Sequence, residues 1–402
     1  MHENQRLRVL VLSRNYPNSV TPILGLWVEG LVRHLAKHCD IKVVAPTPYC
    51  PPLPGFKDFT RFRSVERNLN VDGFEVLHPR FLTGLAYTTY NIESSTYYWS
   101  IRRYVDRLRE KFPFDLIHAN FGYPDGVVAA KLGARYRVPF IITEHASWVP
   151  WMENFPNVRR QAVWAAGRCS FHIAVSRFAR QTISQYTGES EKLRVVPNGV
   201  DAGIFTLRTN GEEMNPFQIL YVGFMRRVKG IDVLLLAMQQ LVKQNPELKL
   251  VLVGGGIYRH SEAQEFDLRK LAENLGIGEN VSFVGIKTPI EVARYMRQSS
   301  VLVLPSRAET FGAVLVEALA CGTPVVATEC GGTVDIVNED VGRLVPKENA
   351  DELAKAIYEV ISARGLFDPV KLREYALKYF GWDQIANRTL ELYGKAISTG
   401  NN

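Results

Sequence analysis

The chain has 402 residues, of which 46% are hydrophobic and 22% are charged. This length exceeds a single ordinary core, so two domains of roughly 200 residues each are expected. The composition is that of a globular protein and excludes a disordered or low-complexity chain. A formal net charge of +7 suits phosphate-bearing ligands or an anionic lipid surface. The basic residues do not gather in one stripe, which speaks against nucleic acid as a partner.

Nothing in the sequence indicates secretion or a membrane span. The N-terminal apolar run, residues 7–12, is shorter than the core of a secretory signal, and no apolar run reaches the roughly 18 residues of a spanning helix. We therefore expect a cytoplasmic protein. The basic stretch 100–111 predicts a helix that can contact the inner face of an anionic membrane as a peripheral protein does. The favoured alternative is that this helix face is simply exposed to solvent.

Short β-branched runs alternate with amphipathic stretches along the chain, which is typical of βαβ units and predicts an α/β fold. Predicted strands of the first series span residues 8–13, 41–45, 115–118, 140–144, 171–175 and 194–196, with helices at 26–37, 126–136 and 177–186. A turn-rich linker starts at Pro197, and the second series spans 218–222, 248–253, 281–284, 301–304, 324–327 and 342–345.

Two strand series predict two Rossmann-like domains, each with a doubly wound parallel sheet, that face a cleft between them. Their expected ranges are 1–200 for the first domain and 201–380 for the second. The last segment, 381–402, is expected to form a helix that crosses back to the first domain.

The most informative stretch, residues 306–328, predicts a strand end, a tight turn, a helix, a glycine stop and a strand. Glu309 is expected at the strand end, and the amides at Phe311 and Gly312 open the helix, where they suit a diphosphate. Glu317 lies along the same helix among apolar residues, where a carboxylate needs a partner. The alternative is that Glu309 only caps the helix and that Glu317 is solvated.

This stretch resembles the E-x7-E motif of the retaining GT-B glycosyltransferases of family 4. Residues 221–230 are similar to that family's G-R-L-x-x-x-K-G motif, residues 195–201 to its I-P-N-G-V-D segment, residues 143–145 to its T-x-H strand end, and residues 16–27 to its first glycine loop. The resemblance covers nearly the whole chain. It implies a GT-B fold and the transfer of a hexose from a UDP- or GDP-type nucleotide sugar, with retention of the anomeric configuration. The implied acceptor is a glycan, a lipid-linked molecule or a small molecule, in polysaccharide or glycoconjugate biosynthesis.

The resemblance also assigns roles to domains and residues: it implies that the domain 1–200 binds the acceptor and that the domain 201–380 binds the nucleotide sugar. It implies that Lys229 holds the donor diphosphate, that Glu309 binds the hexose and that His145 approaches the sugar near the reacting centre. Phe224 stands where the motif has its arginine, so a guanidinium must come from Arg226 or Arg227, or else the site relies on Lys229 and backbone amides. The full set of implied donor-binding positions is Gly25, Gly223, Arg226, Arg227, Gly285, Thr310, Phe311, Gly312, Leu315 and Glu317, with Glu317 on the ribose and the backbone near Gly285 on the base.

No metal and no cofactor are expected. The chain has no D-x-D pair, the motif that holds a divalent metal and the donor diphosphate in another glycosyltransferase fold. The glycine run 254–256 lacks the third glycine of a dinucleotide fingerprint because Arg259 stands there, so a nicotinamide site is unsupported. Two alternatives stay open: a GT-B epimerase or phosphorylase, and a nucleotide-sugar-binding protein without turnover.

Overall fold

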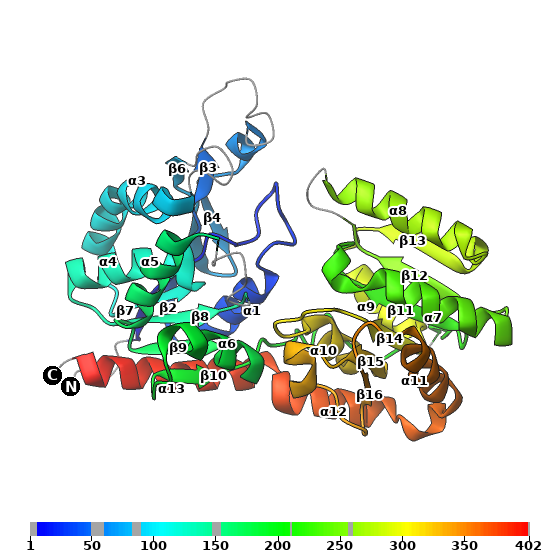
Figure 1. Ribbon diagram of the computed structural model, residues 1–402. Helices are drawn as coiled ribbons and strands as arrows, with labels where there is room; N and C mark the ends of the chain where they lie inside the picture. The colour runs from blue at the N-terminus through cyan, green and yellow to red at the C-terminus, as the bar shows by residue number, and fades with distance from the viewer. Residues whose placement is uncertain are drawn as a thin grey trace. The chain divides into compact units, whose positions relative to one another are not determined.

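The computed structural model describes residues 6–49, 60–82, 90–146, 154–209, 211–255 and 260–400 (Figure 1). The chain divides into two compact units, which are Met1–Asn198 with Ile385–Asn402, and Gly199–Gln384. Each unit contains its own large sheet. Across the described ranges, no helix is both long enough and apolar enough to cross a membrane.

The first unit is built on an eight-stranded sheet of order β10-β9-β8-β7-β1-β2-β5-β4, in which only β4 and β5 pair antiparallel. A separate parallel pair is formed by β3 and β6. The bounds are β1 Arg8–Leu12, β2 Asp40–Val44, β3 Thr47–Tyr49, β4 Asn68–Val71, β5 Phe74–Leu77, β6 Arg80–Leu82, β7 Leu116–Asn120, β8 Phe140–Glu144, β9 Phe171–Ala174 and β10 Leu193–Val195.

Helices of this unit pack on the sheet and on one another, α3 against α4, α4 against α5 and α5 against α6. Their bounds are α1 Leu26–Leu35, α3 Tyr90–Lys111, α4 Val127–Tyr136, α5 Pro156–Ala166 and α6 Arg177–Thr187, with the short helices η1 Arg61–Ser64 and η2 Gly122–Gly126. The C-terminal helix α13, Trp382–Gly400, joins this unit from Ile385 onward. Its Tyr393 hydroxyl lies 2.7 Å from Nδ1 of His118 in β7, so the end of the chain is fixed to the sheet.

The second unit has a six-stranded, fully parallel sheet of order β13-β12-β11-β14-β15-β16. Its strands are β11 Gln218–Val222, β12 Lys249–Val253, β13 Val281–Gly285, β14 Val301–Leu304, β15 Val325–Thr328 and β16 Gly342–Val345. In chain order this is the arrangement 3-2-1-4-5-6, the doubly wound order of a Rossmann sheet. The order reverses between β11 and β14, and ligands of such sheets bind beyond the carboxyl ends of the strands at that point.

Helices cover the second sheet in two groups, α7 with α8 and α11, and α10 with α9 and α12. Their bounds are α7 Ile231–Gln244, α8 His260–Asn274, α9 Pro289–Gln298, α10 Ala313–Ala320, α11 Ala350–Ser362 and α12 Pro369–Phe380, with short helices η4 Arg227–Lys229, η5 Gly278–Asn280, η6 Gly331–Asp335 and η7 Arg364–Leu366. Strands β11, β14 and β15 are buried almost throughout, as strands covered on both faces must be.

Two features differ from the sequence predictions. The segment that holds β3 to β6 was not predicted to contain strands; its strands are only three or four residues long, too short for a clear period. The basic helix expected at 100–111 starts earlier, because α3 begins at Tyr90.

Candidate active site

The two strands at the switch point of the second sheet each lead into a loop with a charged side chain. Lys229 ends the short helix η4 after β11, and Glu309 lies in the loop between β14 and α10. Lys229 Nζ lies 2.6 Å from Glu309 Oε2. Their side chains are 20% and 15% exposed, so the pair is partly shielded from water and still accessible. The structure thus joins two residues that the sequence placed in separate motifs.

Close backbone packing brings the two loops together. Gly230 has a φ of 66°, and a Cβ at this position would lie 2.0 Å from the carbonyl oxygen of Pro305. Only glycine tolerates both the left-handed conformation and this contact. The amide of Arg307 also donates to the carbonyl of Val228 at 2.8 Å. The loop with Lys229 is therefore attached by its backbone to the loop with Glu309.

The side chain of Arg307 adds a second attachment. Its guanidinium donates to both carboxylate oxygens of Asp232 at 2.8 Å each, to Glu348 at 3.0 Å and to the carbonyl of Arg227 at 2.6 Å. A two-pronged contact of this kind holds geometry as well as charge. The hydrogen bond with Asp232 is the main cause that raises the pKa of Arg307 above its usual range. The sequence analysis did not single out Arg307, although it lies within the stretch 306–328.

The loop after β14 differs in one respect from its prediction. The expectation that Glu309 ends a strand is wrong, because β14 ends at Leu304 and Glu309 follows five residues later. The carbonyl of Glu309 accepts a hydrogen bond from the amide of Gly332 at 2.9 Å, which fixes the loop against η6. Gly312, at a φ of 99°, caps the N-terminus of α10, so the helix opens where the sequence predicted.

Other predicted donor residues lie around this helix start. Phe311 and Leu315 are buried, whereas Thr310 is half-buried. Glu317 lies in α10 and is half-buried. In the part of the chain that the structure describes, its carboxylate has no hydrogen-bond or ion-pair partner. Burial raises the pKa of Glu317 to about 7.

The remaining predicted positions of this unit lie on neighbouring strand ends. The amide of Gly223, just after β11, donates to the carbonyl of Val253 at 3.0 Å. Gly285 ends β13, and its carbonyl accepts from Gly254 at 2.9 Å. Arg226 and Arg227 are both exposed, and their guanidinium groups make no hydrogen bond or ion pair with the described residues. Both are free to swing towards a ligand.

The first sheet also reverses its order, between β1 and β7, and His145 lies at this edge directly after β8. The ring centroid of His145 lies 6.0 Å from that of Trp27 and 5.4 Å from that of Phe121. Phe121 has a φ of 85°, a conformation that costs a residue with a side chain about 1–3 kcal/mol and that is found mostly at functional sites.

Gly25 places Trp27 beside His145. Its φ is 83°, and a Cβ would lie 2.1 Å from the carbonyl oxygen of Asn15. The predicted glycine loop therefore packs its backbone against itself and then starts α1, which carries Trp27. This gives Gly25 a positional role next to the histidine.

Both ring nitrogens of His145 lie next to asparagine side chains. Nε2 is 3.0 Å from Oδ1 of Asn120, and Nδ1 is 3.1 Å from Oδ1 of Asn198. Burial is the main cause that lowers the pKa of His145 to about 3, so the ring is neutral at physiological pH. The sequence analysis assigned no role to either asparagine, although Asn198 lies in the segment 195–201 that carries the family resemblance.

A second polar cluster lies near the same edge. Arg14, after β1, forms an ion pair with Glu93 of α3. The amide of Arg14 and the hydroxyl of Tyr97 donate to Oδ1 of Asp125 at 2.9 and 3.1 Å. Asp125 is fully buried, and burial raises its pKa to about 8. No sequence motif indicated this cluster, because its members come from distant segments.

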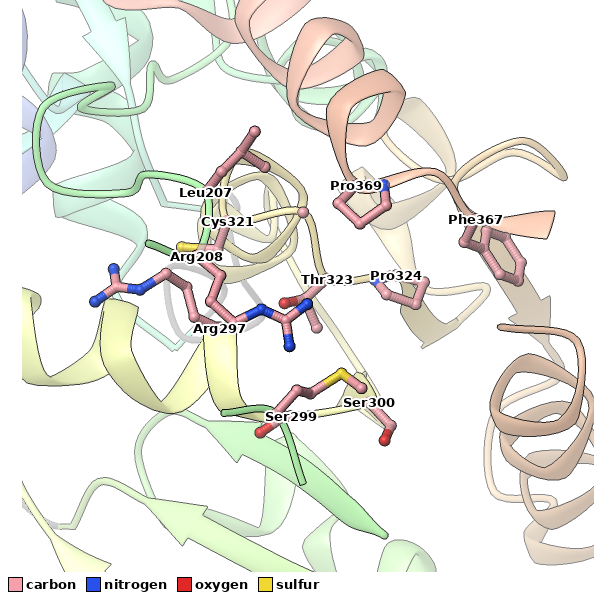
Figure 2. A pocket seen from close by; sticks show the side chains of 12 residues that line it. Leu207, Arg208, Arg297, Ser299, Ser300, Cys321, Thr323, Pro324, Phe367 and Pro369 are labelled. Atoms are coloured by element: carbon pink, nitrogen blue, oxygen red, sulfur yellow. The ribbon is translucent and has the colours of Figure 1, made fainter. Parts of the chain in front are cut away.

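Two further observations define the surroundings. The described residues contain no group of three or more His, Cys, Asp or Glu side chains that could hold a metal ion. A cavity of about 360 Å³ lies at the start of β14 and β15, at the end of the sheet opposite to Lys229 and Glu309 (Figure 2). Its Arg297 is paired with Glu212 at 2.7 Å, and none of the predicted site residues lines it.

Comparisons with known proteins agree for both units. Residues 25–203 match the family model "Glycosyltransferase Family 4", and residues 205–379 match "Glycosyl transferases group 1". The chain is 33% identical over 319 residues to D-inositol 3-phosphate glycosyltransferase 1 of Catenulispora acidiphila, which covers 73% of this chain and 75% of that protein.

Two solved structures show the same fold. Sucrose-phosphate synthase from Thermosynechococcus elongatus superposes with a TM-score of 0.80 at 21% identity, over 98% of this chain and 100% of that one. Anabaena HepE in complex with UDP-glucose superposes with a TM-score of 0.74 at 21% identity, over 97% and 100%. The chain therefore belongs to family 4 of the GT-B glycosyltransferases and is a glycosyltransferase.

Proposed function

We propose that the protein moves a hexose, with retention of the anomeric configuration, from a nucleoside-diphosphate sugar to an acceptor in glycan or glycoconjugate synthesis. The observation that carries this proposal is the Lys229–Glu309 ion pair at the switch point of the second sheet. Ligands of such sheets bind at this point, and a departing diphosphate needs a fixed positive charge there.

The arrangement suggests one role for each charged group. Lys229 and Glu309 neutralise each other in their ion pair. When the donor binds, Lys229 exchanges Glu309 for the diphosphate, and Glu309 becomes free to accept hydrogen bonds from hexose hydroxyls. The open amides at the start of α10 meet the same ligand. Glu317, which lacks a partner among the described residues, is proposed to accept from the ribose hydroxyls, and the backbone near Gly285 to meet the base.

The first unit is proposed to bind the acceptor, with His145 near the reacting sugar carbon. Since HepE holds UDP-glucose, UDP-hexoses are the first donors to test, with GDP-sugars next. Since the relative from Catenulispora acidiphila is named for inositol 3-phosphate, a phosphorylated polyol is one acceptor to test beside glycans and lipid-linked sugars.

We also propose that transfer needs no metal, because Lys229 and the exposed Arg226 and Arg227 can supply the positive charge that the leaving group needs. Turnover should therefore persist in excess EDTA. Complete loss of activity that magnesium or manganese restores would contradict this.

Contact with an anionic membrane is proposed through α3. Its solvent-facing side carries Trp99, which is 62% exposed, together with Ile92, Arg103 and Arg107. An amphipathic ring beside cationic side chains suits the interfacial region of an anionic bilayer.

The proposed function is tested in two steps. Melting curves with UDP-, GDP- and ADP-sugars identify the donor, because a ligand of the native state raises the melting temperature by mass action. NMR of the product then gives the anomeric configuration. Inversion would contradict the retaining mechanism, and the absence of stabilisation by any nucleotide sugar would contradict the donor site.

A further inference from the structure

Hydrogen-bond chemistry at His145 constrains where the ring carries its proton. Asn120 presents Oδ1 at 3.0 Å from Nε2, and Asn198 presents Oδ1 at 3.1 Å from Nδ1. A neutral imidazole has one N–H donor and one acceptor nitrogen, so it cannot donate to two oxygens. A primary amide can turn either its oxygen or its NH₂ group to a neighbour. One of the two asparagines must therefore present NH₂.

The choice between the two asparagines follows from their other contacts. Asn120 donates through Nδ2 to the carbonyl of Leu12 at 3.4 Å, which directs its oxygen to His145. Among the described residues, no second hydrogen bond of the Asn198 side chain decides whether its oxygen or its NH₂ group faces His145. Turning the Asn198 amide thus satisfies both ring nitrogens without breaking another bond.

Among the described residues, none places a charge near the ring that would favour an imidazolium. Glu144 turns its carboxylate to backbone amides, those of Gly122 at 2.8 Å and Ala146 at 3.2 Å. His118 lies in β7, and its own nitrogens lie 2.7 Å from the hydroxyls of Tyr393 and Thr143. Burial of the ring, followed by the nearby His118, lowers the pKa of His145, and these causes outweigh the contact with Asn198, which raises it.

We propose that Asn198 donates its amide N–H to Nδ1 of His145 and fixes the ring as the tautomer with its proton on Nε2, which Asn120 accepts. Both asparagines then position the His145 ring for sugar transfer. This role rests on the function proposed above. A substrate hydroxyl that replaces Asn198 at Nδ1 meets an acceptor nitrogen and must donate a hydrogen bond to it.

The backbone next to Asn198 is closely packed. Asn198 is the last residue of the first unit, and Gly199 begins the second. A Cβ at Gly199 would lie 2.3 Å from the ring of Trp382, so the backbone has little freedom here. This close packing limits the backbone positions open to the neighbouring Asn198, whose side chain contacts His145.

The direct test is long-range ¹H–¹⁵N NMR of the histidine rings in the full chain, with the His145 signals assigned by their loss in His145→Gln. We expect a neutral ring protonated on Nε2 at pH 7. Asn198→Asp should move a proton to Nδ1, because a carboxylate only accepts. A wild-type ring protonated on Nδ1 or on both nitrogens would overturn the proposal, as would an unchanged ring in a folded Asn198→Asp variant.

Tyr393→Phe is the matched control, because it removes the equivalent contact at Nδ1 of His118 and leaves the partners of His145 in place. It should leave the His145 signals unchanged. Kinetics test the positioning role separately: Asn198→Ala should lower kcat roughly 10-fold with little change in donor KM. An unchanged kcat would overturn that role. If the wild type transfers no sugar, the proposed function fails, whereas the NMR result still decides the tautomer.

Discussion

The predicted catalytic side chains of the two units have chemically different partners. At the switch point of the second sheet the side chains are charged and paired, Lys229 with Glu309 and Arg307 with Asp232. At the first sheet, His145 is neutral and is held by amides. Charges preorganised in a partly shielded site stabilise developing charge, whereas neutral hydrogen-bonding groups orient hydroxyls. The comparison predicts that removing a charge in the second unit affects catalysis more than removing a neutral contact in the first.

The largest effect is expected at Lys229. Lys229→Ala removes a contact that strengthens as the diphosphate departs, so kcat/KM should fall by about 2–4 kcal/mol, roughly 30-fold to 1000-fold. Steady-state rates with the identified donor measure this. Lys243→Ala, at an exposed position of α7, is the matched control and should behave as the wild type. Unchanged rates in a folded Lys229→Ala variant would refute the assigned role.

A smaller effect is expected at Arg307, which joins the two loops without meeting the ligand. Arg307→Lys keeps the charge but cannot reproduce contacts to Asp232, Glu348 and the Arg227 carbonyl together. We expect kcat/KM to fall by about 1–2 kcal/mol, roughly 5-fold to 30-fold, at a temperature where the protein stays folded.

Arg343→Lys serves as the control for Arg307, because Arg343 also donates to backbone carbonyls, those of Glu339 at 3.0 Å and Gly342 at 2.8 Å, but its contact with a carboxylate, Glu359, is long, at 3.8 Å. Should Arg307→Lys lower the melting temperature but leave kcat/KM intact, Arg307 would contribute only to stability.

Glu317 predicts a pH dependence of stability. Its pKa rises from 4.5 to about 7 on folding, so the folded state binds more protons between these values. The free energy of unfolding therefore falls as the pH rises from about 4.5 to 7, and Glu317→Gln avoids this loss. Above pH 7 the variant should be more stable than the wild type by at most about 3 kcal/mol, with no difference near pH 4.

Melting curves across this pH range measure the effect of Glu317→Gln, and Glu329→Gln, at an exposed position, is the control. Equal stabilities of wild type and Glu317→Gln at pH 8 would show that the carboxylate is not disfavoured in the fold.

The weakest expected effect concerns the membrane. Replacing Arg103 and Arg107 by Gln should weaken the free energy of binding to anionic liposomes by about 1 kcal/mol per residue, which flotation measures. Added salt should weaken the binding of the wild type as well, because it screens the same charges. If flotation depends neither on the charges of Arg103 and Arg107 nor on salt, these arginines do not contact the membrane and belong to an ordinary solvent-exposed face of α3.

Much of the second unit was predictable because its site residues lie in short local motifs. The stretch 306–328 predicted the helix start at Gly312 and the strand β15, and the elements around Lys229 followed the predicted order. The sequence could not show that Lys229 and Glu309 form an ion pair, because 80 residues separate them and only the sheet order brings β11 and β14 together.

The site of the first unit was less predictable for a similar reason. His145 was identified through the resemblance of residues 143–145 to a family motif, but its partners Asn120 and Asn198 come from two other segments. Neutral amides have no periodic pattern or charge that would distinguish them in a sequence. The buried cluster around Asp125 depends in the same way on contacts between distant segments.

The most direct test of the central claim is calorimetric titration of the identified nucleotide sugar into the wild type, Lys229→Ala and Lys243→Ala. The account predicts that the donor binds the wild type and Lys243→Ala equally and that Lys229→Ala loses affinity, because the diphosphate loses its cation. Equal donor affinity in all three folded proteins would contradict a donor site at the Lys229–Glu309 pair.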